Sequence, residues 1–98
     1  MANTAFGLNS LVLNTTGSEN TAVGGSSLDN NTTGSYNTAV GRVSLFRNKA
    51  NSRSTALGYF ALYGADDREI GRETFNTTVG YGALRTYYTV KKVLQLLV

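Results

Sequence analysis

The chain has 98 residues, a formal net charge of +3, and no Cys, His, Trp or Pro. Without Cys or His it has no disulfide framework and no thiolate or imidazole ligands, which excludes zinc-finger, haem, iron–sulfur, Cys-protease and Ser-His-Asp chemistry. Gly, Asn, Thr and Ser supply 42 of the residues, so aliphatic core material is scarce in a domain that buries only about 60–65% of its unfolded surface.

One pentapeptide recurs along the chain. Its copies begin at residues 3, 20, 37, 54 and 76, and every copy ends in Gly. A Leu follows four residues after each of these Gly, and an Asn-Thr-Thr-Gly turn follows the first two Leu, at residues 14–17 and 31–34. In the third copy the turn reads Asn-Lys-Ala-Asn, with Asn51 in place of the Gly. A period of 17 residues is too short for helix-pair repeats and suits one coil of a β-solenoid, so we predict an all-β, parallel β-solenoid of about five coils.

Within each coil the pentapeptide is predicted to be one short strand and the Ser-Leu segment after the Gly a second one. Because side chains alternate along a strand, Thr and the large apolar residue share one face and Ala the other. We expect the large apolar residue and the later Leu to form two interior ladders. The predicted core is Phe6, Val23, Val40, Leu57 and Val79, together with Leu11, Leu28, Leu45, Leu62 and Leu84. The predicted turn glycines, which permit left-handed backbone, are Gly7, Gly24, Gly41, Gly58, Gly80, Gly17 and Gly34.

Two large aliphatic residues are little apolar burial for a coil of 17 ordered residues, so each coil is short of core. Small side chains let another backbone approach closely. We therefore expect the chain to form an oligomer with itself, and a dilute monomer to be unfolded. The face predicted to meet the other chains carries Ala5, Ala22, Ala39 and Ala56.

The Asn-Thr-Ala-Val-Gly units with Asn-Thr-Thr-Gly-Ser turns between them resemble the head repeats of trimeric autotransporter adhesins (YadA-like heads). They are more similar still to the related repeats of bacteriophage tail fibres and bacterial surface fibres. The resemblance covers about residues 3–85. It implies a left-handed parallel β-roll, three chains around one axis, and attachment to a surface from an extracellular, cell-surface or virion location. The sequence departs from the adhesin pattern in its longer period of 17 residues and in the lack of a stalk or membrane anchor.

We divide the chain into a repeat domain at residues 1–85, with an insertion at 64–71, and a C-terminal segment at 86–98. In that segment Val90, Val93 or Leu94, and Leu97 have spacings that suit the start of an amphipathic helix, a neck leading into a coiled coil. A last strand or end cap is the alternative. No run of 18 apolar residues occurs in the sequence, so no membrane insertion is expected. The start of the chain does not have the pattern of a signal peptide, which indicates either another export route or a piece of a longer protein.

The insertion in the fourth coil is the first candidate site, because insertions in solenoids become loops on one face, often the binding face. It holds four of the six carboxylates beside two Arg. A hard-cation site or a catalytic pair is conceivable from Asp66, Asp67 and Glu69. We favour a self-paired solvated loop, because the Arg residues neutralise the carboxylates locally, and expect no enzyme activity, metal or cofactor. The predicted receptor contacts here are Asp66, Asp67, Arg68 and Arg72.

Aromatic residues form the second candidate site, since seven of the ten lie in the second half of the chain. Tyr59 and Tyr81 both follow the repeat Gly and should lie near each other. Together with Tyr63 they suit either carbohydrate recognition or the packing of a seam between chains. Basic residues also gather between Arg42 and Arg53, which we interpret as a solvated edge without a nucleic-acid partner.

The predicted function is that of a structural and adhesive fibre module, in a phage tail fibre or a bacterial surface adhesin, that attaches through a trimeric solenoid. Its partners would be itself and a cell-surface glycan or protein receptor. A self-assembling extracellular filament is the alternative, because an uncapped solenoid offers unpaired edge strands. An ice-binding solenoid is a further alternative, on the Thr column at Thr4, Thr21, Thr38, Thr55 and Thr77.

Overall fold

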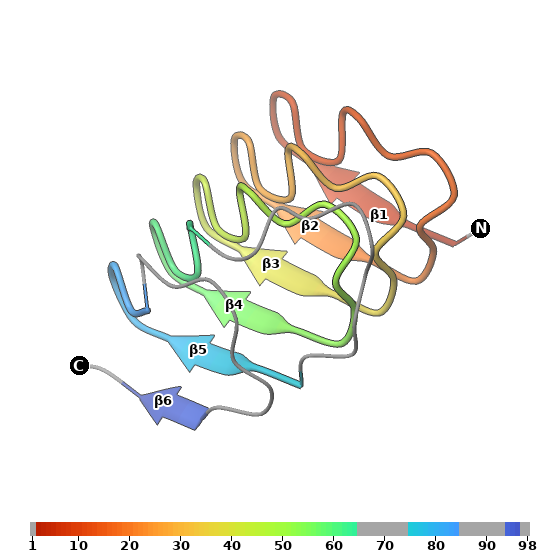
Figure 1. Cartoon of the computed structure of the whole chain (residues 1–98). Coiled ribbons are helices and arrows are strands. Elements are labelled where there is room, and N and C mark those ends of the chain that lie inside the picture. The colour runs from red at the N-terminus through yellow and green to blue at the C-terminus, as the bar shows by residue number, and fades with distance from the viewer. Residues whose placement is uncertain (1, 65–74, 85–93, 97–98) are drawn as a thin grey trace.

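A computed structural model of the chain describes residues 2–64, 75–84 and 94–96. These residues contain six short strands and no helix. They are β1 (Thr4–Phe6), β2 (Thr21–Val23), β3 (Thr38–Val40), β4 (Thr55–Leu57), β5 (Thr77–Val79) and β6 (Leu94–Leu96). All six form one parallel sheet in the order of the sequence (Figure 1). Since each connection returns the chain to the start of the next parallel strand, the predicted all-β solenoid is confirmed.

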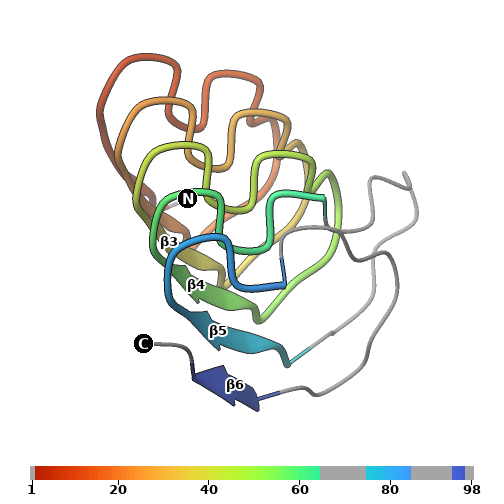
Figure 2. The ribbon, with the colours of Figure 1, turned by 90° about the vertical axis from the view of Figure 1, so that its left-hand side faces the viewer.

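The register between neighbouring strands follows the repeat. Thr21 pairs with Thr38 and Ala22 with Ala39, and the same pairing recurs from β1 to β5. Figure 2 shows the coils stacked above one another with the strands in line. Beyond the repeat, β6 pairs with β5, so residues 94–96 are a strand and not part of a helix. The rest of the predicted segment 86–98 lies outside the described residues.

Each coil contains one strand, so the predicted second strand is wrong. After the repeat Gly the chain runs through turns in which two residues have left-handed backbone, such as Ser26 (φ 59°) and Leu28 (φ 51°). The same two positions are left-handed again in the next coil, at Val43 and Leu45. A positive φ every second residue prevents extended pairing and instead folds the chain back on itself.

The two sets of turn glycines act for different reasons. The Gly at the end of each repeat has a φ between 123° and 131°, as in Gly24, which confirms the prediction for this set. Gly17 and Gly34 do not have positive φ, so left-handed backbone is the wrong explanation for them. A Cβ on Gly34 would instead run into the carbonyl oxygen of Asn51 in the next coil. These two glycines are needed because the coils approach closely there.

The core lies between the strands and the opposite wall of turns. Leu28, Leu45 and Leu62 have no exposed surface, which confirms the Leu ladder. The other predicted ladder is wrong, because Phe6 is 76% exposed and Val40 is 37% exposed. Val23, Leu57 and Val79 of that ladder are only half-buried.

The Ala face of the strands points inward. Ala22, Ala39 and Ala56 are fully buried within the chain, so they cannot be the surface that meets other chains. The narrow interior is the reason, since the Leu side chains come from the opposite wall and leave room only for methyl groups on the strand side. At β5 this position holds Thr78, whose buried hydroxyl has no hydrogen-bond partner among the described residues.

Buried amides complete the interior. Asn20 is 1% exposed; its Nδ2 donates to the Gly34 carbonyl at 2.8 Å and its Oδ1 accepts from the Asn37 N–H at 3.0 Å. A second ladder links Asn48 to Asn31 and Asn31 to Asn14, with Nδ2 to Oδ1 distances of 2.9 Å. Each amide is thus bonded within its coil and to the neighbouring coil, which ties the coils together where aliphatic side chains are few.

Candidate functional site

The outward face of the sheet is the first surface that stands out. We call it the sheet face; it consists of Thr4, Phe6, Thr21, Val23, Thr38, Val40, Thr55, Leu57, Thr77 and Val79. The parallel register sets the Thr residues in one straight column and the apolar residues in another. None of these residues is charged. The face is therefore a flat, uncharged strip with an apolar column along its length.

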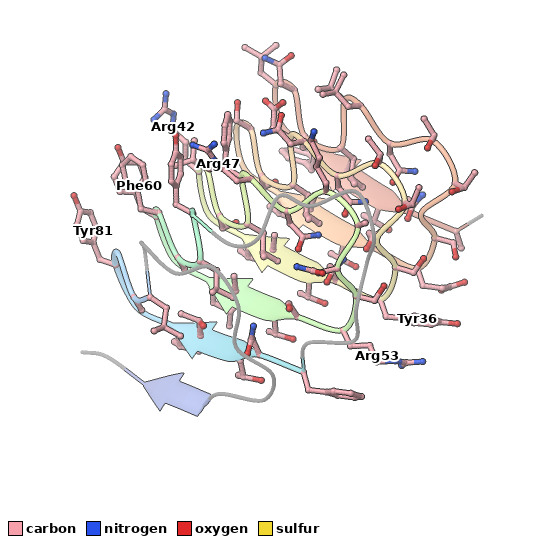
Figure 3. The ribbon with its side chains drawn as sticks, viewed as in Figure 1. Tyr36, Arg42, Arg47, Arg53, Phe60 and Tyr81 are labelled. Atoms are coloured by element: carbon pink, nitrogen blue, oxygen red, sulfur yellow. The ribbon has the colours of Figure 1, made fainter. Side chains whose placement is uncertain are left out.

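Two columns of larger side chains flank the sheet face. The entry column precedes each pentapeptide and consists of Glu19, Tyr36, Arg53 and Phe75. The exit column follows each repeat Gly and consists of Leu8, Gly25, Arg42, Tyr59 and Tyr81. Figure 3 shows Tyr36 and Arg53 on the side where the chain enters the strands, and Arg42 and Tyr81 on the opposite side.

Neighbours within a column touch. Arg53 Cζ lies 4.5 Å from the centroid of the Tyr36 ring, within the range of a cation–π contact. In the exit column the Tyr59 and Tyr81 ring centroids are 5.2 Å apart, which confirms that these two residues lie together. The entry-column positions in these coils have left-handed backbone, with φ between 52° and 67°, and this conformation turns their side chains outward from the coil.

A third group, the turn cluster, lies on the outer turns and consists of Phe46, Phe60 and Tyr63. Phe46 and Tyr63 stack with centroids 5.1 Å apart and planes 8° from parallel. Phe60 meets Tyr63 edge to face at 4.9 Å and Tyr59 at 4.3 Å. The sequence reasoning named Tyr63 and missed Phe46 and Phe60. Their signal was the spacing of 17 residues between Phe46 and Tyr63, which places two rings one above the other.

The remaining predicted site residues, Asp66, Asp67, Arg68 and Arg72, lie outside the described residues. The described part contains no group of three or more acidic side chains that could hold a metal ion. Nor does any helix there have the length and apolar character to cross a membrane. Arg42 and Arg47 lie on the side of Phe60, whereas Arg53 lies on the opposite side (Figure 3), so these basic residues do not form a single stripe.

Comparison of the chain with protein-family models, with curated proteins and with solved structures gives no match. The resemblance to adhesin heads and fibre repeats therefore stays a prediction. The function has to be argued from the sheet face, its flanking columns and the turn cluster.

Proposed function

We propose that the chain is a structural and adhesive module of an extracellular fibre, in a phage tail fibre or a bacterial surface adhesin, that attaches through a trimeric β-solenoid. The carrying observation is the sheet face, which exposes an apolar column in a chain whose own interior is already filled. By resemblance the coils wind left-handed, and the module acts at a cell or virion surface.

The composition of the sheet face supports a second and third copy as its partners. Contiguous exposed apolar surface marks interaction sites in soluble proteins. A column that repeats with every coil is matched best by an identical column, and three flat sheets can close around one axis. Closure matters because a closed ring of identical chains uses all of the sheet face and leaves none to aggregate.

Receptor contact is proposed on the outer side of this trimer. Tyr63, with the turn cluster around it, presents ring faces that suit the apolar faces of sugars, and Tyr59 and Tyr81 lie beside it. The loop residues Asp66, Asp67, Arg68 and Arg72 would supply directed polar contacts. Three copies of such a surface on one particle would bind a multivalent glycan far more tightly than one copy does.

Sedimentation equilibrium of the full chain tests the trimer, with Val40→Glu as the variant. Three carboxylates brought together inside an apolar seam cannot all be ionised there, so the variant should lose the trimer mass. Val12→Glu is the matched control, because Val12 is exposed on a turn outside the sheet face, and it should keep the trimer mass. A folded monomer of the wild-type chain, or an intact Val40→Glu trimer, would refute the proposal.

A filament subunit remains the second candidate. It is favoured by β1, which pairs only with β2 and thus offers an open edge to another chain. Electron microscopy separates the two, since a fibre module forms discrete particles and a filament forms long threads. The Thr column lies on the same sheet face as the apolar column, so a measurement of thermal hysteresis tests the ice-binding alternative.

A further inference from the structure

We infer that the seam between neighbouring chains is formed by the entry column of one chain and the exit column of the next, with Arg side chains stacked on aromatic rings at matching strand levels. This inference rests on the proposed trimer and adds to it the identity and register of the contacts. The occupant of both columns is therefore a second copy of this chain.

Uncovered apolar surface is concentrated on one side of the molecule. Among the described residues eight large hydrophobic side chains are exposed. Six of them belong to the sheet face or its flanking columns: Phe6, Val40, Leu8, Tyr81, Tyr36 and Phe75. The other two, Val12 and Leu13, lie on a turn. The rings of the turn cluster, in contrast, are half-buried. A partner that covered only the sheet face would leave Tyr36, Phe75 and Tyr81 in water, so the interface has to extend to both flanks.

Symmetry brings the two columns together. In a ring of three parallel chains, each interface joins two different patches, and rotation without translation keeps equal levels side by side. The strand runs from the entry column to the exit column in every coil. Consequently the entry side of one chain meets the exit side of its neighbour, and each strand level meets its own level.

The residues at matching levels complement one another. The pairs are Tyr36 with Arg42 at β3, Arg53 with Tyr59 at β4, and Phe75 with Tyr81 at β5. Two of these pairs join a guanidinium to a ring and the third joins two rings, which are favourable contacts at centroid distances of about 4.5–7 Å. No level places two cations together, although the described parts of both columns contain an Arg.

Other registers differ in a way that an experiment can resolve. Shifting one chain by one coil in one direction places Arg53 opposite Arg42, a pair of like charges. The opposite shift places Arg53 opposite Tyr81 and Glu19 opposite Arg42, which is also attractive. The equal-level register follows from closed threefold symmetry, so the test has to distinguish Tyr59 from Tyr81 as the neighbour of Arg53.

Disulfide trapping provides this test, because the chain contains no Cys. The double variant Arg53→Cys/Tyr59→Cys carries one thiol in each column at the level of β4. Within one chain the two positions are separated by the extended segment 54–58, about 13 Å at about 3.3 Å per residue. A disulfide needs Cα atoms about 4.4–6.8 Å apart, so a bond can form only between chains. Mild oxidation should convert most of the protein to a covalent trimer on a non-reducing gel.

A second double variant, Tyr36→Cys/Arg42→Cys, tests the level of β3 and should give the same product. The single variants should give no covalent trimer, because each seam then holds one thiol. The register control is Arg53→Cys/Tyr81→Cys, which should cross-link poorly.

The results separate the seam from the proposed function. If the wild-type chain sediments as a trimer and neither equal-level pair cross-links, the seam is overturned and the trimer stands. If Arg53→Cys/Tyr81→Cys cross-links better than Arg53→Cys/Tyr59→Cys, the equal-level register is overturned. If the wild-type chain forms no trimer, the proposed function itself fails and the seam fails with it.

Discussion

Replacement of Asn20 by Ala tests whether buried amides hold the coils together. Asn20 Nδ2 donates to the Gly34 carbonyl and its Oδ1 accepts from the Asn37 N–H. The Gly34 carbonyl keeps a second donor, Asn31 Nδ2, at 3.1 Å. The Asn37 N–H, in a residue with no exposed surface, is left buried without this acceptor.

The expected cost follows from these two contacts. A buried donor left unpaired costs about 1–3 kcal/mol, and the lost bond to a carbonyl that retains another donor adds about 0.5–1.5 kcal/mol. We expect Asn20→Ala to lower the free energy of unfolding by about 2–4 kcal/mol. Asn30→Ala is the matched control, since the half-buried Asn30 side chain makes no hydrogen bond with the described residues. It should change stability by less than about 0.5 kcal/mol.

Urea unfolding followed by circular dichroism measures both variants, at one protomer concentration because association contributes to the stability. Asn20→Asp adds a pH dependence. Burial against the Gly34 carbonyl should raise the pKa of this carboxyl above its value in the unfolded chain. The folded state then binds the proton more tightly, so the deficit of Asn20→Asp is largest near neutral pH and shrinks as the pH falls. Equal stabilities of Asn20→Ala and Asn30→Ala, or a deficit that grows on acidification, would refute the amide ladder.

Two further predictions concern single positions. Gly34→Ala should destabilise the chain by about 3 kcal/mol or more, because the added Cβ meets a main-chain oxygen of the next coil that cannot move without breaking the stack. Gly25→Ala is its control: the nearest atom to a Cβ there is 3.8 Å away, so thermal unfolding should show no loss. Thr78→Val removes the buried hydroxyl without a partner and should raise the free energy of unfolding by about 1–2 kcal/mol, whereas Thr33→Val on an exposed turn should have little effect; a loss of stability in Thr78→Val would show that the hydroxyl is bonded.

The repeat was sufficient to predict the period, the parallel register and the Leu ladder. A period of 17 residues places equivalent residues one above another, so one correct assignment applies to every coil. The repeat Gly was equally readable, since few residues tolerate the φ near 125° observed at Gly24 and Gly41.

The inward face of the strand was not readable from the same pattern. Alternation separates Ala22 from Thr21 and Val23, yet it does not say which face is inside. The opposite wall decides this, because left-handed backbone at Leu28 directs a large side chain inward. The space that remains suits Ala22, and Val23 is left on the outer face.

The buried amides were misread for a related reason. Asn is common in turns, so Asn14 and Asn31 were taken as turn residues, although Asn20 and Asn37 recur at the same period. Recurrence itself was the signal, since a turn former is replaceable by Gly or Ser while a ladder of amides needs Asn in each coil to bond to the next. The predicted loop site could not be evaluated, because residues 65–74 lie outside the described part of the chain.

The positions that repeat and the positions that vary serve different requirements. Stacking one coil on the next requires the same interior at each level, which is why Ala22 and Leu28 recur as Ala39 and Leu45. Columns that were also uniform would pair with a neighbouring chain equally well at any register. The flanking columns instead change from level to level, and the cost of placing Arg beside Arg disfavours one of the shifts. Variation beside a uniform sheet face thus gives the proposed assembly a preferred register that the repeat alone could not specify.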